Sequence, residues 1–322
     1  MSWRAWVDWM DREEDALSLA VVRIVCGLTV AFHLLHLVYV GAPRLIWVEA
    51  DLGGFRDLDS PLVNALGGAT PDTLAWLIPA TVVAAFTMAA GLATRLAVFL
   101  TWLGFRALAD LNAHAGGSYD ELLLNILFLL LLSGCGGRLS VDARLGWARS
   151  TIPAWPRYVL IFQLAWMYFA TALQKVSIHW VPWGDLDALW YILQQPTWQR
   201  RSMTWLAPLH PLTRAATLLT WCFEVSAPLL PLAIWYRGTR TRAGRLRAWL
   251  NRLDWRTKYL TVGVGMHLGI EATMEVGAFT FATAALYAAC LHPDEWAAAF
   301  RWTASATGAY VGRTSTTSSP AS

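Results

Sequence analysis

The stretch LSLAVVRIVCGLTVAFHLLHLVYV, at residues 17–40, decides the fold of this chain. Arg23 is its only permanently charged side chain, and the stretch exceeds the roughly 20 apolar residues that a helix needs to cross a bilayer. Seven more apolar stretches follow, at residues 74–94, 96–113, 121–135, 157–178, 214–236, 257–275 and 278–292. The sequence therefore predicts an all-α integral membrane protein, a bundle of about eight transmembrane helices.

The overall composition favours a membrane protein over a soluble one. Of the 322 residues, 56% are hydrophobic and 15% are charged, and the mean hydropathy is +0.41, whereas soluble domains carry about 25% charged residues. The lipid bilayer is thus the expected solvent, and the 20 tryptophans suit its headgroup level. The four cysteines lack a C-x-x-C pair, so no metal site is predicted. The basic residues concentrate in loops, so the net charge of +3 does not indicate a nucleic acid partner.

The charges between the apolar stretches predict the orientation of the helices. Residues 237–258 carry eight basic side chains and one acid, and residues 135–157 are also mainly basic, whereas residues 41–73 are mainly acidic. Basic loops favour the cytoplasmic side of a membrane. With eight spans, both termini are then cytoplasmic, and the chain is a multi-pass protein of the cell (inner) membrane.

A single membrane domain accounts for most of the chain. We expect a cytoplasmic N-terminal segment at residues 1–15, the membrane domain at 16–296 and a disordered Ser/Thr-rich tail at 303–322. The segment 179–212 alternates aromatic clusters with Pro, Gly and charge, which suggests a lid at the membrane interface. Three prolines inside apolar stretches are expected to kink their helices: Pro79, Pro228 and Pro231.

Lys175, in the sequence YFATALQKVSIHW, is the strongest indication of a functional site. A lysine inside a spanning helix costs about 2.5–3.5 kcal/mol on insertion scales and usually has a function or a partner. Because Lys175 lies near a helix end, it also fits a lysine that reaches the headgroups by snorkelling. If it is buried, desolvation disfavours the ammonium, and the neutral amine can act as a general base. The residues alone leave both interpretations open.

Three further ionisable groups lie at membrane depth. His267 and Glu271 are four residues apart and share one helix face. On that face they can share a proton or hold a polar ligand group, or they can form a structural hydrogen-bonding stripe between helices. Glu224 is another intramembrane carboxylate, and pairing with a cation such as Lys175 is its default interpretation.

A polar turn precedes the fourth predicted span. Asn112 and His114 lie just before it, and Tyr119 lies at its end. Ser118 is expected to cap the helix, with Glu121 at the capping-box position. Capping alone explains these last two residues.

Several segments of the sequence are distinctive by the order in which they follow one another along the chain. The chain contains LAVVRIVCG at residues 19–27, GLATRLA at 91–97 and SYDELLLNILFLLLLSGCGGRLSVDARL at 118–145. Then come QLAWMYFATALQKVSIHW, WGDLDALWYIL, FEVSAPLLPL, MHLGIEATMEVGAFTF and the closing HPDEW. Over roughly residues 16–296 this succession resembles the membrane domain of vitamin K-dependent γ-glutamyl carboxylases and of bacterial proteins with the horizontally transferred transmembrane (HTTM) domain.

The resemblance implies an enzyme that uses a reduced quinone of the vitamin K or menaquinone type, held in the apolar bundle. By residue match, Lys175 would be the catalytic base that deprotonates the reduced quinone. His267 would stabilise charge or position the substrate. The substrate or quinone pocket, expected toward the external face, would also include His114, Asn112, Tyr119, Glu224, Glu271 and Trp180.

The chain departs from the carboxylase pattern in two places. The carboxylases have Asn-His directly before the Ser-Tyr of the fourth helix, whereas this chain has Gly116 and Gly117, with His114 three positions earlier as the substitute. The large C-terminal region by which carboxylases bind propeptide-bearing substrates has no counterpart after residue 296. We therefore expect a peptide or small-molecule substrate rather than a clotting factor.

Two functions fit the resemblance. The first is a carboxylase-like lyase or quinone-dependent monooxygenase that modifies a secreted peptide or small molecule at the external face. The second is a maturation or export component for a secreted peptide, similar to the membrane protein of sporulation-delaying toxin systems, without carboxylation. The sequence does not decide between them.

Overall fold

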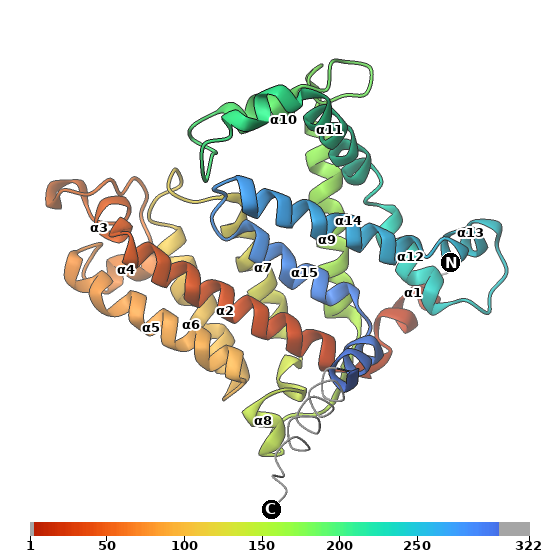
Figure 1. Ribbon diagram of the computed structural model, residues 1–322. Helices are drawn as coiled ribbons and strands as arrows, with labels where there is room; N and C mark the ends of the chain where they lie inside the picture. Colours follow the sequence, from red (N-terminus) through yellow and green to blue (C-terminus); the bar gives the residue numbers. More distant parts are fainter. Residues whose placement is uncertain (1–2, 303–322) are drawn as a thin grey trace, which may run out of the picture.

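The computed structural model describes residues 3–302, which are mostly helical (Figure 1). The tail at residues 303–322, for which disorder is expected, lies outside the described residues. The longer helices are α1 (Trp3–Met10), α2 (Leu17–Tyr39), α5 (Pro71–Ala90), α6 (Thr94–Ala109), α7 (Ser118–Leu132), α9 (Trp155–Gln174), α11 (His210–Val225), α12 (Leu229–Gly238), α13 (Arg245–Arg252), α14 (Trp255–Thr273) and α15 (Phe279–Cys290). The shorter elements are α3 (Ala42–Ile46), α4 (Pro61–Ala65), α8 (Val141–Arg144), α10 (Ala188–Gln194), the 3-10 helices η1 (Ala50–Leu52), η2 (Cys135–Gly137) and η3 (Thr204–Leu209), and the strands β1 (Glu13–Asp15) and β2 (Thr151–Pro153).

Each of the eight predicted spans corresponds to a helix or a helix pair. Within residues 3–302, α2 and α5 are long and apolar enough to cross a membrane, and a bent pair of helices over residues 204–238 makes up to a third candidate. The helices at the other predicted spans, which are α6, α7, α9, α14 and α15, are shorter or less apolar. The fold is therefore that of a helical membrane protein with two or three candidate spans by length and composition.

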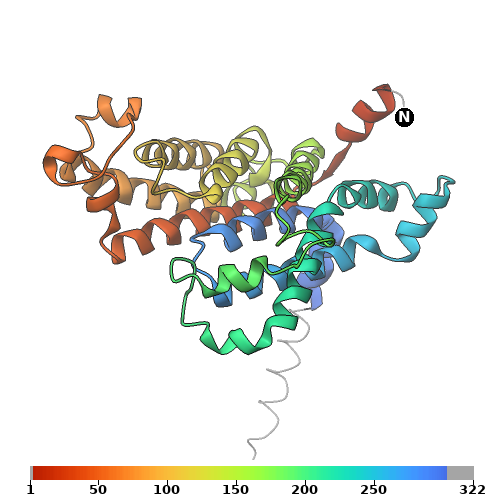
Figure 2. The same ribbon diagram turned by 90° about the horizontal axis from the view of Figure 1, so that it is seen from above.

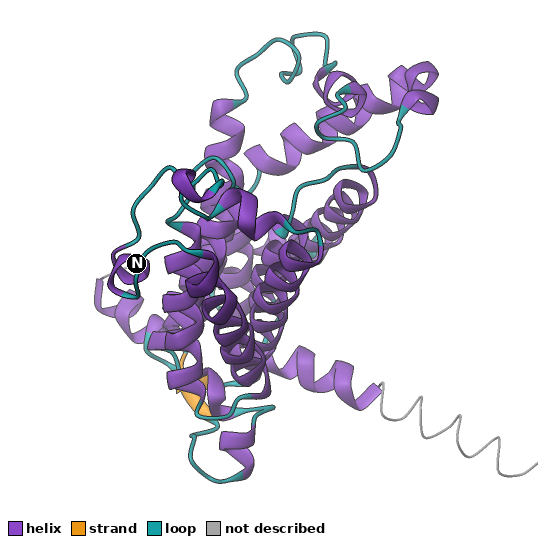
Figure 3. Ribbon diagram, turned by 90° about the vertical axis from the view of Figure 1, so that its left-hand side faces the viewer, coloured by secondary structure: helices purple, strands orange, loops and turns teal. Residues whose placement is uncertain are grey.

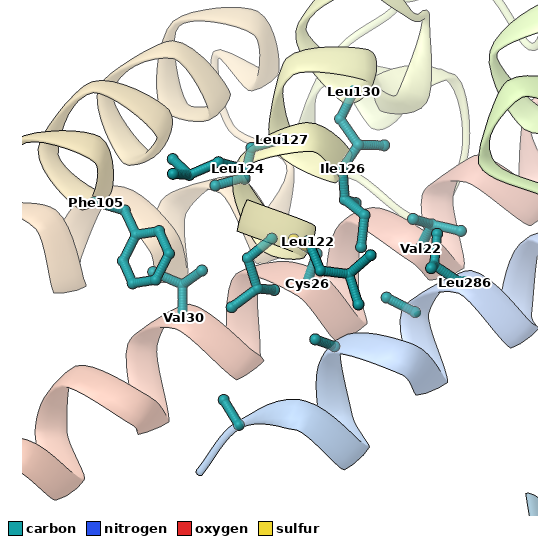
Figure 4. Close-up of a cluster of buried hydrophobic side chains, with 14 of the residues drawn as sticks. Val22, Cys26, Val30, Phe105, Leu122, Leu124, Ile126, Leu127, Leu130 and Leu286 are labelled. Atoms are coloured by element: carbon teal, nitrogen blue, oxygen red, sulfur yellow. The ribbon is translucent and has the colours of Figure 1, made fainter. Parts of the chain in front are cut away.

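Helix α2 lies in the middle of the bundle, between α5 and α15 (Figures 1 and 2). A glycine permits the close approach of α2 to α5: a Cβ atom at Gly27 would lie 2.8 Å from the Ala85 carbonyl oxygen. Small residues at such contacts are typical of helices that pack inside a bilayer. On its other side α2 meets α6, α7 and α15 in the apolar cluster shown in Figure 4, to which Cys26, Phe105 and Leu286 belong. This cluster packs α15 against the helices of the first half of the bundle.

Arg23, the one cation of the first apolar stretch, has a structural role. Its side chain is fully buried and donates to four backbone carbonyls, among them that of Cys135 at 2.7 Å. Nearby, the Asp142 carboxylate accepts the backbone N–H groups of Ala93 and Thr94 at 2.8 and 2.7 Å. Both side chains satisfy backbone groups that helix ends leave without partners. They explain why the arginine and the Ser-Val-Asp sequence are present.

The prolines expected to kink helices differ in their effect. The stretch predicted at 214–236 is broken into α11 and α12, which are bent by 56°, and Pro228 lies at the junction as the residue before α12. A proline removes a helical hydrogen bond and clashes with the preceding turn. Pro79 lies inside α5, which continues to Ala90.

The N-terminal segment is fastened to the middle of the chain. β1 pairs antiparallel with β2, so that Glu14 lies opposite Ile152 (Figure 3). The Glu14 carboxylate accepts two hydrogen bonds from the Arg157 guanidinium, at 2.6 and 2.8 Å, and both side chains are buried. β1 is thus packed against the start of α9.

Candidate functional site

Lys175 and Glu224 form an ion pair at the ends of two helices. Lys175 directly follows α9, and Glu224 is the penultimate residue of α11. The Lys175 Nζ atom contacts both carboxylate oxygens of Glu224, and the two side chains are 14% and 6% exposed. These low values rule out free snorkelling of Lys175, and the cation partner expected for Glu224 is present.

Trp180 completes the surroundings of the ammonium. The Lys175 Nζ atom lies 4.7 Å from the centre of the Trp180 ring. Trp180 lies in the turn after α9, where its backbone N–H donates to the Ser177 carbonyl at 2.9 Å. A cation over an indole face is attracted by the ring quadrupole, by about 2 kcal/mol when it is desolvated. The Lys-x-x-x-x-Trp spacing therefore corresponds to a contact between the ammonium and the indole ring.

Glu224 lines a cavity of about 400 Å³, whereas its partner Lys175 does not. The cavity lies between α7, α9, α11 and α14, and His267 on α14 forms another part of its wall. Its polar lining also includes Glu121 and Asn125 on α7 and Gln163 on α9. A cavity of this size with a few convergent polar groups is typical of a small-molecule site.

His267 belongs to a buried network of aromatic hydroxyls. Its Nε2 atom lies 2.5 Å from the Tyr168 hydroxyl, which lies 2.8 Å from the Tyr287 hydroxyl. The Nδ1 atom of His267 lies 3.2 Å from the Thr283 hydroxyl. All four side chains are buried. Because imidazole and phenol groups can both donate and accept, this chain of groups can relay a proton.

A second, apolar groove of about 550 Å³ lies on the other side of His267. It runs between α2, α14 and α15, where Val21, Leu260 and Ala284 are among its lining residues. His267 is common to the walls of the groove and the cavity. The groove also contains the Thr280 hydroxyl, which is buried and lacks a hydrogen-bond partner within the described structure. An unpaired buried hydroxyl is costly, so this group is available to a ligand.

The sequence profile of the HTTM domain matches residues 11–197, more than half of the chain. The chain belongs to the HTTM domain family. The matched range contains Lys175 and Trp180, whereas Glu224 and His267 lie after it. No curated protein and no solved structure matches the chain. The family is related to the membrane domain of vitamin K-dependent carboxylases, so the HTTM match supports a membrane protein of that type.

Asn112 and His114 lie away from the Lys175 pair in the HTTM domain. The Asn112 amide donates to the carbonyls of Ile46 and Phe55, and its oxygen accepts two backbone N–H groups of the turn. All its hydrogen-bonding capacity is thereby used within the fold. The His114 side chain is 91% exposed, and its nearest acid is Asp57 at 3.5 Å. The structure does not bring these two residues to the cavity.

Tyr119 lies at the boundary of the site. Its ring packs edge-on against His33, with 5.1 Å between the ring centres, and it lines a separate cavity of about 30 Å³. The cap expected at Ser118 is wrong by one position, because Gly117 precedes the helix and Asp120 accepts the Gly117 N–H at 2.9 Å. The side chain of Ser118 instead lines the larger cavity.

Glu271 fastens the predicted lid rather than sharing a proton with His267. The Arg200 guanidinium lies 2.7 Å from Glu271 and 3.5 Å from Glu275. The backbone supports the same contact, since the Arg200 N–H donates to the Thr273 carbonyl at 3.1 Å. In Figure 1 the loop after α10 reaches the end of α14. The segment 179–212 is therefore tied to the helix that carries His267.

Sequence reasoning missed Tyr168 and Tyr287. Tyr168 precedes Lys175 by seven residues, two helical turns, and so lies on the same face of α9. That spacing was a usable signal for Tyr168. Tyr287 gave none, because its position depends on the packing of α15 against α9 and α14. Across residues 3–302, no group of three or more His, Cys, Asp or Glu side chains is placed to hold a metal ion.

Proposed function

We propose that this HTTM protein is a membrane enzyme that uses a reduced quinone from the bilayer to modify a peptide or small molecule at the external face. The observation that carries the proposal is the Lys175–Glu224 pair beside a cavity whose wall includes His267. Lysine is expensive at membrane depth, and here it has a carboxylate and an indole as its surroundings. Such a pair is better suited to moving a proton than to stabilising the bundle, because a buried ion pair adds little stability.

The proton can move within the pair. In the ionic form Lys175 is an ammonium and cannot act as a base. Transfer of its proton to Glu224 gives a neutral amine and a neutral acid, which avoids the cost of two charges in a low-dielectric interior. Lys175 lines neither the cavity nor the groove, so a proton from the substrate reaches its amine by way of the groups that line them, and Trp180 stabilises the ammonium that results. Glu224 acts through Lys175 and is a positioning residue.

The apolar groove fits a quinone. Its lining is almost wholly apolar, which suits a polyprenyl tail, and the free Thr280 hydroxyl suits a ring oxygen. His267 would stand between the quinone ring and the cavity. A reduced quinone of the vitamin K or menaquinone type supplies, on reaction with oxygen, the strong base that carboxylation needs. The protein side chains would hold the quinone ring, exclude water and accept the proton that the reduced quinone loses.

The membrane topology follows from the loop charges. We propose eight spans, with α11 and α12 as one broken span, and both termini in the cytoplasm. The basic segment 237–258 then lies inside the cell, and Lys175 and the segment 179–212 lie toward the external face. The tie between Arg200 and Glu271 supports the placement of the lid at the same end as the ion pair.

The test is oxygen-dependent epoxidation of a reduced naphthoquinone by the purified protein in nanodiscs. Three proteins are compared: wild type, Lys175→Ala and Lys258→Ala. Lys258 is exposed at the start of α14 and is the matched control for loss of one lysine. We expect epoxide from wild type and Lys258→Ala and none from Lys175→Ala, with all three folded by thermal scanning.

Two results would overturn the proposal. Wild-type activity in Lys175→Ala would show that Lys175 is not the catalytic base. If folded wild type forms no epoxide with any of several reduced quinones, the proposed quinone chemistry is excluded. That result would favour the maturation or export of a secreted peptide without carboxylation.

A further inference from the structure

The loop between α12 and α14 carries a group of exposed arginines. Arg240, Arg242, Arg245 and Arg252 are all exposed. The ion pairs found here within the described chain belong to Arg237 and Arg256 instead, whose partners are Asp254 and Glu295. Four cations that have no carboxylate partner among residues 3–302 therefore face outward from one short segment, and they form a surface of high positive charge.

Helix α13, in the middle of this loop, is firmly docked on its inner side. The Arg247 guanidinium lies over the rings of Trp235 and Tyr236, 5.4 and 4.7 Å from their centres. Leu250 is 1% exposed, and the Asn251 amide donates to the Tyr236 carbonyl at 3.1 Å. These contacts hold the helix in one orientation, so that its outer face is defined by the fold.

The outer face combines cations with large apolar side chains. Arg245, Trp249 and Arg252 are spaced at i, i+4 and i+7 and so lie on one face of α13, opposite Arg247 and Leu250. Trp249 is 48% exposed, and Leu246 at the edge of this face is 46% exposed. Tryptophan flanked by arginine suits the level of lipid headgroups, where an indole lies among acyl chains and a guanidinium binds phosphate.

We propose that the outer face of α13, formed by Arg245, Leu246, Trp249 and Arg252, binds the headgroups of anionic phospholipids and lies on the surface of the bilayer. Basic residues in a loop set the membrane orientation by their number alone, so that role does not require a folded helix. The docked helix presents one guanidinium group on each side of a single indole. Arginine binds phosphate in a bidentate manner, and basic segments next to spanning helices are attracted to anionic lipid. This proposal does not depend on the proposed quinone chemistry.

The experiment places a fluorescent label beside the proposed surface. Three of the four cysteines are buried and Cys222 is exposed, so Cys222→Ser leaves no accessible thiol. Ala248 is exposed on α13, and Ala248→Cys accepts the label. The full-length protein is placed in phosphatidylcholine nanodiscs that contain a small fraction of headgroup spin-labelled phosphatidylglycerol or spin-labelled phosphatidylcholine. Quenching of the label reports which lipid gathers at α13.

We expect stronger quenching by phosphatidylglycerol than by phosphatidylcholine, with the difference falling as salt is added. Arg245→Gln with Arg252→Gln should lower the preference by about fivefold for each arginine removed. Arg245→Lys with Arg252→Lys keeps the charge and should retain most of it. The matched control is Arg144→Gln with Arg149→Gln, which removes two exposed arginines from the loop around α8 and should leave the preference unchanged.

Three outcomes would overturn the proposal. Equal quenching by both lipids means that α13 touches the bilayer without selecting charge. Absence of quenching means that the outer face of α13 lies in water. An equal loss of preference in the α13 and α8 variants means that total charge, rather than the α13 face, attracts the lipid.

Discussion

Replacement of Arg157 by methionine should be among the most destabilising single changes in this protein. Glu14 and Arg157 are 5% and 2% exposed, and two hydrogen bonds join them at 2.6 and 2.8 Å. Methionine fills much of the same volume but leaves the Glu14 carboxylate buried without its partner, which costs about 3–5 kcal/mol. For a chain of this size we expect the unfolding temperature to fall by roughly 5–15 °C. Thermal scanning of the protein in nanodiscs measures the shift.

The neighbouring pair of Asp15 and Arg138 is the matched control. It is also joined by more than one hydrogen bond, but its side chains are 32% and 48% exposed, so Arg138→Met should cost at most about 1 kcal/mol. The double variant Glu14→Leu with Arg157→Met should recover most of the lost stability, because neither charge remains. Equal shifts for Arg157→Met and Arg138→Met, or a double variant as unstable as Arg157→Met, would refute the reasoning.

Two further results are expected. A Cβ atom at Gly263 would lie 2.1 Å from the Tyr287 hydroxyl, so Gly263→Ala should displace Tyr287 and lower the epoxidation rate; an unchanged rate would show that the hydroxyl network is dispensable. Burial raises the pKa of Glu295, but hydrogen bonds from Arg256 and the His292 N–H, with the nearby arginine charges, outweigh it and hold the pKa below its usual 4.5. Glu295 therefore stabilises the fold above pH 4.5 and loses this effect as the pH falls through its lowered pKa. The unfolding temperature of wild type should drop over that range more than that of Glu295→Gln, and parallel curves would contradict this assignment.

The helices were predictable because their apolar stretches are long and are separated by charged loops. All eight predicted stretches coincide with helices, within a few residues at each end. The Lys175–Glu224 pair was also predictable, since two opposite charges at membrane depth have few other partners. What the pattern cannot give is which helices touch. The tyrosine network around His267 depends on that packing, and nothing in the local sequence of α15 marks Tyr287.

Two of the predicted pocket residues, Asn112 and Glu271, have partners elsewhere, for different physical reasons. Asn112 sits where the chain turns, and an amide side chain there is used up by nearby backbone groups. Glu271 shares a helix face with His267, but Arg200 arrives from a distant loop and takes the carboxylate. Helical periodicity places residues on a face, and only the tertiary fold decides which neighbour that face meets.

The contact between Glu14 and Arg157 also constrains the order in which the chain can be assembled. During synthesis Glu14 emerges long before Arg157, so its carboxylate has no buried partner until the first residues of α9 have been made. The same guanidinium donates to the Ala289 carbonyl near the end of α15, at 3.2 Å. A single side chain therefore joins an early, a middle and a late segment, and its set of contacts cannot be complete until α15 has been made.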